Sequence, residues 1–254
     1  MNWAWPFRRG PRPDRDVPWI EPALGDPEGL IGVGGELAPE MLLRAYSEGV
    51  FPWFSAGDPV LWWSPDPRAV IELGELRISR RLARTMRSGK FHATADQCFE
   101  RVMRACGESR TEGTWVTEEM IQAYTALHRV GYAHSVEVWC EAEPNPPAPF
   151  PKKEGGDRSL SPVREGLVLA GGIYGVTIGG LFAGESMFHT VTDASKVALA
   201  ALVERLKKQG FVLFDVQMTT EHTERMGAVE IPRDEYLRRL KDAVTMQDVR
   251  FADY

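Results

Sequence analysis

Two apolar segments in the last third of the chain each carry a carboxylate. Glu185 lies in residues 181–188 (LFAGESMF), and Asp215 lies in residues 211–217 (FVLFDVQ). Both segments have the apolar and aromatic composition that is typical of buried strands. An ionised carboxylate in such a strand is costly to desolvate unless it is paired or hydrogen-bonded, and such groups tend to be retained where they carry out chemistry. Glu185 and Asp215 are therefore candidate catalytic residues. The alternative is a structural role in which backbone donors bind both carboxylates.

The surrounding sequence predicts the elements that position these two strands. From about residue 70 onward, strand-like and helix-like patterns alternate. The clearest helix is expected at 193–209, where an apolar stripe repeats at helical spacing before Gly210 ends it. Ser79 is a suitable N-cap for another helix. Further helices are expected at 79–88, 96–106 and 118–130, and further strands at 135–140 and 167–178.

The first part of the chain has a different character. Residues 1–67 are rich in Pro, Gly and Trp and contain one predicted helix, at 39–47. Residues 141–165 hold five prolines before Lys152 and show no apolar periodicity, which is typical of a flexible insertion. We therefore expect an α+β protein with a small loop-rich N-terminal lobe at 1–67 and a larger domain at 68–254.

Composition narrows the classes of function. The 254 residues carry a net charge of −6, so any contact with nucleic acid must use a local patch. No apolar run approaches the length of a membrane span, and the arginine pair at 8–9 is not followed by the apolar stretch of an export signal. The three cysteines form no CxxC pair, and the five histidines show no metal-ligand spacing. We expect a cytoplasmic protein that uses no metal or other cofactor and does not contact a membrane.

One predicted helix carries a basic stripe. At 100° per residue, Arg80, Arg84 and Arg87 fall close together on one side of the helix at 79–88, and Leu82 faces roughly the opposite way. Three guanidinium groups on one exposed stripe suit phosphate oxygens, so these residues are candidate contacts to RNA. A solvated charged face is the alternative. If the stripe makes three phosphate contacts, the logarithm of the affinity for RNA should fall with the logarithm of the salt concentration, with a slope of about −2 to −3.

Two common enzyme patterns fit poorly. The run Gly184-Glu185-Ser186 resembles the start of a serine-hydrolase elbow, but Phe188 stands where the second glycine belongs, and a polar loop rather than a helix follows. Acyl-CoA enzymes bind pyrophosphate with a glycine-rich turn before a helix. The corresponding turn here, at 189–193, has no glycine and ends in a carboxylate. Acyl-CoA is therefore a poor candidate donor, whereas an acyl group carried in another way stays an open alternative.

Several segments together resemble the leucyl/phenylalanyl-tRNA–protein transferases. The likeness runs in order from about Glu21 to Leu240 and is specific as a set. Besides the two carboxylate strands, the matching segments are GGEL at 34–37, GVFPWF at 49–54, LWWSPDPR at 61–68, GTW at 113–115, AHSVEVW at 133–139, GGIYGV at 171–176 and DASK at 193–196. Two features depart from the family: His189 replaces a usual serine, and the insertion at 141–165 is atypical.

The resemblance implies a fold and a reaction. The larger domain would resemble the acyl-CoA N-acyltransferase (GNAT-like) fold, with a mixed sheet. The enzyme would move Leu or Phe, and less readily Met, from leucyl-tRNA or phenylalanyl-tRNA to the α-amine of proteins that begin with Arg or Lys, which marks them for N-degron proteolysis. We expect a monomer. The alternatives are a non-catalytic protein that binds tRNA or protein N-termini, and an acyl-CoA-dependent N-acyltransferase.

The resemblance also suggests roles for single residues. Asp215 and Gln217 lie two apart on one strand and are expected to share a face, so that Asp215 polarises the amide of Gln217, which holds the attacking amine. Glu185 would contact the amine or the cationic acceptor side chain. The remaining candidates would bind substrate: an apolar slot for the donor side chain, formed by Ile173, Phe182 and Met187, and two aromatic residues that stack on the terminal adenine, Trp53 and Trp115.

Overall fold

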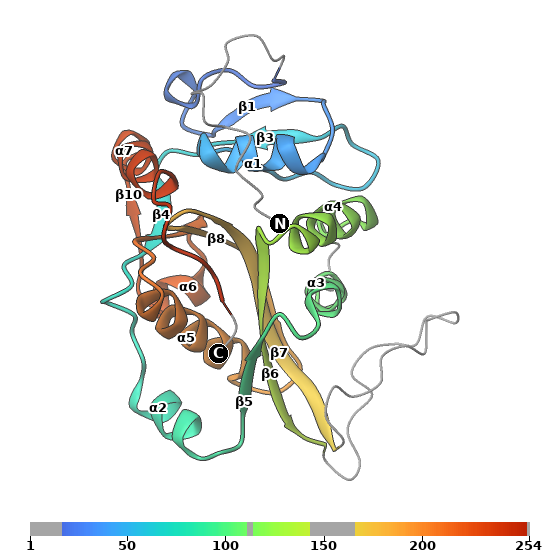
Figure 1. The fold of residues 1–254 in the computed structure, drawn as a ribbon, viewed down its shortest axis with the longest axis vertical. Coiled ribbons are helices and arrows are strands. Elements are labelled where there is room, and N and C mark those ends of the chain that lie inside the picture. The colour runs from blue at the N-terminus through green and yellow to red at the C-terminus, as the bar shows by residue number, and fades with distance from the viewer. Residues whose placement is uncertain (1–16, 111–113, 143–165, 253–254) are drawn as a thin grey trace.

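The computed structural model describes residues 17–110, 114–142 and 166–252, which form two sheets (Figure 1). The smaller sheet has strand order β1-β3-β2 and lies with helix α1 (Pro39–Ser47) in the N-terminal part of the chain. Its strands are β1 (Leu30–Val33), β2 (Phe51–Pro52) and β3 (Leu61–Trp63). A short 3-10 helix, Pro22–Leu24, precedes β1.

The larger sheet has seven strands in the order β10-β4-β9-β8-β7-β6-β5. In chain order these are β4 (Arg68–Ile71), β5 (His92–Ala95), β6 (Ala133–Glu141), β7 (Leu167–Ile178), β8 (Leu181–His189), β9 (Leu213–Gln217) and β10 (Ala228–Ile231). The helices that accompany them are α2 (Arg80–Arg87), α3 (Phe99–Glu108), α4 (Glu118–Arg129), α5 (Ala194–Lys208), α6 (Glu221–Arg225) and α7 (Arg233–Val244).

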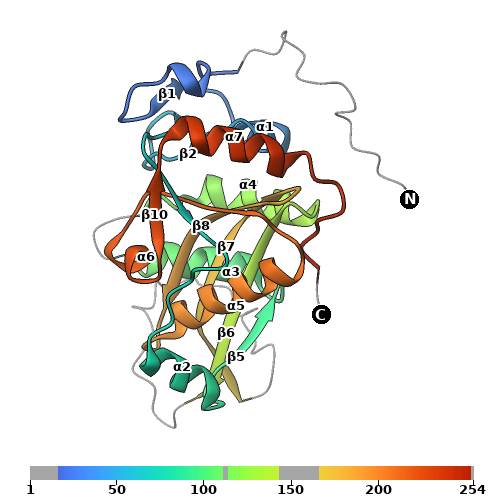
Figure 2. The same ribbon diagram turned by 90° about the vertical axis from the view of Figure 1, so that its left-hand side faces the viewer.

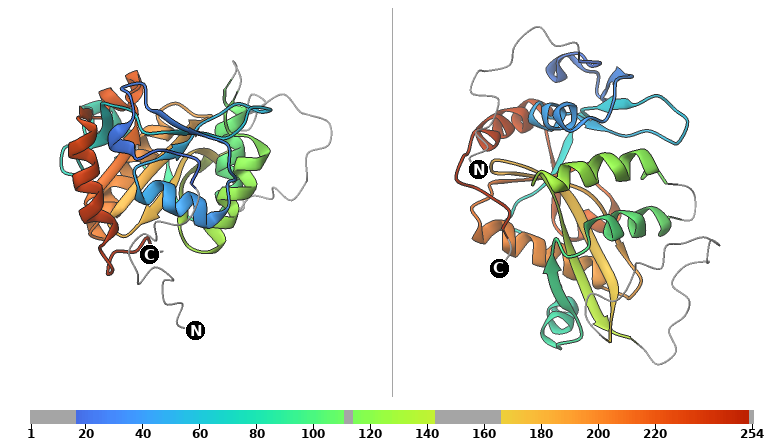
Figure 3. Two further views of the ribbon diagram at one scale, coloured as in Figure 1. Left: turned by 90° about the horizontal axis from the view of Figure 1, so that it is seen from above. Right: turned by 45° about the vertical axis from the view of Figure 1, so that its right-hand side comes forward.

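Helices cover both faces of the larger sheet. Helices α3 and α4 lie side by side on one face, and α5 packs across the other (Figure 3). The core on the α3 and α4 side continues without a break into the small lobe, because Trp62 of β3 and Leu42 of α1 belong to the same buried cluster as Tyr174 of β7. Helix α7 runs beside α1 at the end of the sheet where β10, β4 and β9 lie (Figure 2).

The larger sheet contains one parallel pair of neighbouring strands. All adjacent strands are antiparallel except β8 and β9, which are parallel. Their pairing begins at Leu181 opposite Leu213 and ends at Ala183 opposite Asp215, although both strands continue beyond these residues. The ends of β8 and β9 therefore separate just where the two carboxylate segments place their polar residues.

Most predicted elements are confirmed. Helices α1, α4 and α5 and strand β7 lie within one or two residues of their expected bounds, and the Ser79 hydroxyl caps α2 by accepting from the Leu82 amide at 3.1 Å. Helix α3 begins at Phe99, three residues after the predicted start at 96. The reason is Asp96, whose φ of +54° is not helical. Strands β1 to β5, strand β10 and helices α6 and α7 were not predicted.

The α+β class and the mixed sheet are confirmed. Most of the predicted insertion, residues 143–165, lies outside the described residues. Among the described residues, no helix has both the length and the apolarity needed to cross a bilayer.

Candidate active site

Glu185 occupies a bulge in β8. Tyr174 of β7 pairs with Ser186 and Gly175 pairs with Gly184, so Glu185 is the extra residue on the bulged strand. Gly175 is required here, because a Cβ on it would lie 2.2 Å from the carbonyl oxygen of Ala183. A bulge breaks the strict alternation of side chains. As a result, both Glu185 and Ser186 make contacts on the side of the sheet that α3 and α4 cover.

Two tyrosines and one amide hold the Glu185 carboxyl group. The hydroxyl of Tyr46, from α1, donates to Oε1 at 2.7 Å, and the side-chain amide of Gln217 donates to the same oxygen at 3.2 Å. The hydroxyl of Tyr124, from α4, lies 3.5 Å from Oε2 and also forms a hydrogen bond with Tyr46. The donors thus come from α1, from α4 and from β9, and all three are uncharged.

Burial raises the pKa of Glu185 to about 8. The hydrogen bond from Tyr46 opposes this rise, whereas the negative charge of Asp215 adds to it. Burial and the charge of Glu185 also raise the pKa of Tyr46 and of Tyr124 well above 10, so both remain neutral donors. A carboxyl group with a pKa near the working pH can both accept and release a proton during a reaction.

Asp215 sits in a different environment. Its side chain is 1% exposed, and it forms a bidentate pair with Arg68 of β4, with Nε to Oδ1 at 2.9 Å and Nη2 to Oδ2 at 2.7 Å. The hydroxyl of Tyr236, from α7, donates to Oδ2 at 2.8 Å. Arg68 also donates to the carbonyl of Gly49 at 3.0 Å, which ties the small lobe to this pair. Both carboxylate oxygens of Asp215 are therefore already occupied.

The predicted contact between Asp215 and the side-chain amide of Gln217 is wrong in detail. Strand β9 is bulged against β4, where Ala69 pairs with Gln217 and Val70 pairs with Asp215. Gln217 has a φ of +57°, a conformation that is strained for a residue other than glycine. Asp215 accepts the backbone N–H of Gln217 at 2.9 Å, which leaves the side-chain amide to bind Glu185. Gln217 therefore links the two carboxylates across the opening between β8 and β9.

The predicted apolar slot lies on the α5 face of the sheet. Ile173 and Phe182 are buried, and Met187, which is partly buried, packs against the same cluster. Ile173 and Met187 are direct cross-strand partners, and the ring of Phe182 meets that of Phe214 edge to face at 5.7 Å. The three residues are thus brought into one cluster, and their role in binding a donor side chain stays a prediction.

The two predicted stacking residues are both accessible to some degree. Trp53 is 38% exposed and packs against Trp63, with ring centroids 5.8 Å apart. Trp115 is partly buried, and the guanidinium group of Arg110 lies 5.6 Å from its ring centroid. Contact of either tryptophan with an adenine stays a prediction.

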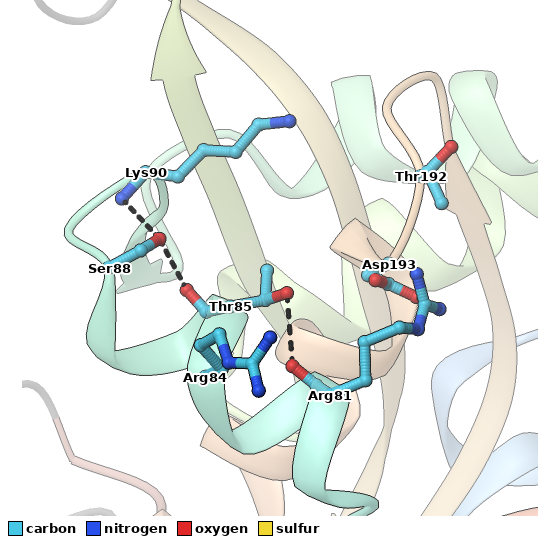
Figure 4. A pocket seen from close by; sticks show the side chains of 7 residues that line it. All are labelled: Arg81, Arg84, Thr85, Ser88, Lys90, Thr192 and Asp193. Carbon is cyan, nitrogen blue, oxygen red and sulfur yellow. Dashed lines mark hydrogen bonds and ion pairs between the residues drawn. The ribbon is translucent and has the colours of Figure 1, made fainter.

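The basic stripe is exposed as expected. Arg80, Arg84 and Arg87 are accessible, whereas Leu82 is buried. Beside the stripe lies a pocket of about 330 Å³ between α2 and the start of α5 (Figure 4). Its lining consists of Arg81, Arg84, Thr85, Ser88, Lys90, Thr192 and Asp193. Asp193 pairs with Arg81 at 2.7 Å, so part of the positive charge there is compensated. Contact of the stripe with RNA stays a prediction.

Four residues that hold the two carboxylates were not among the predicted site residues: Tyr46, Tyr124, Tyr236 and Arg68. One of them carried a signal, because Arg68 precedes the apolar run Ala69-Val70-Ile71 and so poses the same desolvation problem as Asp215. The tyrosines gave no such signal, since an aromatic residue in an apolar stripe is ordinary core composition.

The fold also gathers two histidines that are separate in the sequence. Potential ligand atoms of Asp96, His128 and His134 all lie within 4.8 Å of one another. Nδ1 of His134 is 2.7 Å from Asp96, and Nδ1 of His128 is 2.8 Å from the carbonyl of Ala133. These bonds join the start of α3, the end of α4 and the start of β6, which accounts for the cluster as a hydrogen-bond network.

This chain is similar to proteins of one family. Residues 70–143 and 158–241 match the family described as leucyl/phenylalanyl-tRNA protein transferase, and residues 35–66 match the N-terminal domain of that family. The transferase of this name from Anaeromyxobacter sp. (strain K) is 47% identical over 239 residues, which cover 93% of this chain and 92% of the relative. The one from Magnetococcus marinus is 49% identical over 225 residues, which cover 88% of this chain and 87% of the relative.

A solved structure gives a weaker match. L-PGS from Bacillus licheniformis aligns with a TM-score of 0.36 and 13% identity, over 61% of this chain and 46% of that one. Likeness at this level carries no argument about fold, so the predicted GNAT-like fold stays a prediction.

Proposed function

The chain belongs to the leucyl/phenylalanyl-tRNA protein transferase family, which makes it an aminoacyltransferase, and from this premise we propose its substrates and mechanism. It transfers a leucyl or phenylalanyl group, and less readily a methionyl group, from the 3′ end of tRNA to a protein. The acceptor is the α-amine of a protein that begins with Arg or Lys, and the product is directed to proteolysis. The enzyme acts as a cytoplasmic monomer, and its larger domain has the GNAT-like fold.

The observation that carries this proposal is the Glu185 carboxyl group, with a pKa of about 8 at the separated ends of β8 and β9. An α-amine has a pKa of about 8, so its proton and that of Glu185 are closely matched. The neutral amine attacks the ester carbonyl, a C–N bond forms, and the amine proton passes to Glu185. The C–O bond to the ribose then breaks, and Glu185 returns the proton to the departing oxygen.

Asp215 and Gln217 act on the geometry of this step. The buried pair of Asp215 with Arg68 fixes the end of β9, and Asp215 accepts a hydrogen bond from the backbone N–H of Gln217, which supports the strained conformation of Gln217. The side-chain amide of Gln217 is thereby aimed at Glu185 and at the incoming amine. Positioning of this kind accelerates a reaction between two bound groups because their entropy of association is lost before the chemical step.

The remaining candidates bind the substrates. Ile173, Phe182 and Met187 accept the donor side chain, since an apolar slot with a flexible thioether fits both Leu and Phe. They lie on the α5 side of the sheet, opposite the contacts of Glu185, so this role requires the side chain to enter between the separated ends of β8 and β9. Trp53 and Trp115 stack on the terminal adenine. Three of the exposed arginines of α2 bind tRNA phosphates: Arg80, Arg84 and Arg87.

A direct transfer assay tests this function. The protein is mixed with leucyl-tRNA and two peptides that differ only in their first residue, Arg or Ala, and the peptide masses are measured. We expect the Arg peptide to gain one leucyl group and the Ala peptide to stay unchanged. If the Arg peptide gains nothing while a transferase of the same family acts on it, the proposed function is wrong. Calorimetry with CoA tests the acyl-CoA alternative.

A further inference from the structure

Arg110 lies beside the bulge that carries Glu185. It follows the end of α3, and its Nη2 donates to the hydroxyl of Ser186 at 3.2 Å. Ser186 is buried and adjoins Glu185 in the chain. Ser186 thus links the Arg110 guanidinium to the candidate catalytic residue through one hydrogen bond and one peptide unit.

The same guanidinium lies over an aromatic ring. Its carbon is 5.6 Å from the ring centroid of Trp115, a distance at which cation and ring attract each other. Arg110 therefore contacts both parts of the proposed donor site: the residue next to the reacting group and the ring that stacks on the terminal adenine. A ligand that contacts Trp115 and reaches the bulge at Ser186 would lie close to this cation.

Arg110 differs from neighbouring arginines in its charge environment. Arg104, six residues earlier and within α3, pairs with Glu100 and Glu118, and Arg68 of β4 pairs with Asp215. Within the part of the chain that the structure describes, Arg110 makes no ion pair, and the residue is exposed. An exposed planar guanidinium that lacks a carboxylate partner is suited to the oxygens of a phosphate.

We propose that Arg110 binds the phosphate on the 5′ side of the terminal adenosine of the donor tRNA and thereby positions the aminoacyl ester against Glu185. This inference rests on the proposed function. The acceptor peptide brings a cationic side chain and an amine, neither of which a guanidinium attracts. On the donor, the negative charge nearest to the 3′ ester is this phosphate, so it is the group that suits an Arg110 guanidinium in contact with Trp115 and with Ser186 beside Glu185.

Two minimal donors isolate this phosphate. One is the leucyl ester of adenosine, and the other is the leucyl ester of adenosine 5′-(methyl phosphate), which adds one diester charge. With an Arg-first peptide as acceptor, we expect the wild-type protein to show a kcat/KM about tenfold or more higher for the phosphate-bearing donor, the size of one charge-assisted hydrogen bond. Arg110→Ala should bring this ratio to about one, and Arg110→Lys should retain part of it.

A matched control removes a different exposed arginine. Arg129 lies at the end of α4, and Arg129→Ala should leave the ratio at its wild-type value. The same comparison is made with full leucyl-tRNA in which the last phosphodiester is replaced by an uncharged methylphosphonate. We expect this replacement to slow the wild-type protein about as much as Arg110→Ala does, and to slow the variant little further.

The ratio separates binding of the phosphate from a structural role. A wild-type protein that uses both minimal donors, or both forms of leucyl-tRNA, equally well contradicts the proposal. So does an Arg110→Ala protein that is slower with both donors by the same factor, because Arg110 would then merely support Trp115 or Ser186. If the wild-type protein fails to transfer leucine from unmodified leucyl-tRNA, the proposed function itself is wrong.

Discussion

The two carboxylates of the site have similar sequence surroundings but opposite environments. Glu185 is partly buried and is held by neutral donors, chiefly the hydroxyl of Tyr46, and its pKa is raised to about 8. Asp215 is fully buried and is paired with the permanent charge of Arg68, with Tyr236 as a further donor. A carboxyl group that lies among neutral donors and has a raised pKa can exchange protons near neutral pH, whereas both oxygens of Asp215 are already occupied by the guanidinium of Arg68 and the hydroxyl of Tyr236. On this contrast we base the proposal that Glu185 transfers the proton and that Asp215 positions Gln217.

The largest expected effect is on the rate of transfer when Glu185 is altered. Glu185→Gln keeps the size and hydrogen bonds of the side chain but cannot accept a proton. We expect kcat to fall by about 10²–10⁴-fold, the usual contribution of a general base. Single-turnover transfer from leucyl-tRNA measures the rate, and a filter-binding assay for leucyl-tRNA should give an unchanged affinity. A loss of less than threefold in kcat would show that the amine loses its proton by another route.

The next effect is on stability, when the pair on β9 is broken. Arg68→Ala leaves Asp215 buried without its cation, and loss of one partner of a buried pair costs about 3–5 kcal/mol in the free energy of unfolding. Urea unfolding measures this. Arg104→Ala, which removes an exposed arginine with two carboxylate partners, should cost about 1 kcal/mol or less. Equal losses for the two variants would mean that the Arg68 pair contributes no more than a surface pair.

The sequence predicted the strands that carry the two carboxylates better than it predicted the residues that hold them. The two carboxylate strands and the long helix α5 follow from local composition and periodicity, and they are confirmed. The partners of the carboxylates depend on contacts between distant segments, such as Tyr46 with Glu185 across 139 positions, which no local pattern encodes. The bulges at Glu185 and before Gln217 depend on strand register, so the expectation of a regular strand failed there.

A third effect concerns the pH dependence of stability. The pKa of Glu185 in the folded protein, about 8, lies above its ordinary value of 4.5, so the folded protein keeps a proton that the unfolded chain releases between these pH values. This contribution to stability is therefore present below about pH 4.5 and is lost as the pH rises to about 8. The side chain at position 185 cannot ionise in Glu185→Gln, so the variant lacks this pH-dependent contribution to stability. We expect the variant to gain stability relative to wild type from pH 5 to pH 8, as measured by urea unfolding at both values.

A constant difference between the two proteins over this pH range would contradict the raised pKa. Asp66→Asn, which alters a carboxyl group of the chain outside this site, controls for general effects of charge removal.

The smallest effect sharpens the comparison by altering a neutral donor alone. Tyr46→Phe removes the 2.7 Å hydrogen bond that opposes the rise in the pKa of Glu185, so the pKa should rise further. Because one hydrogen bond to a charged group is involved, we expect the rise of kcat/KM with pH to move toward higher pH by about one unit or less. The α-amine of the acceptor peptide titrates identically with both proteins, so any displacement between their pH profiles reports Glu185. Tyr236→Phe instead removes a donor to Asp215. If Glu185 transfers the proton, the pH profile of kcat/KM for Tyr236→Phe should keep the wild-type midpoint, even if the variant is slower.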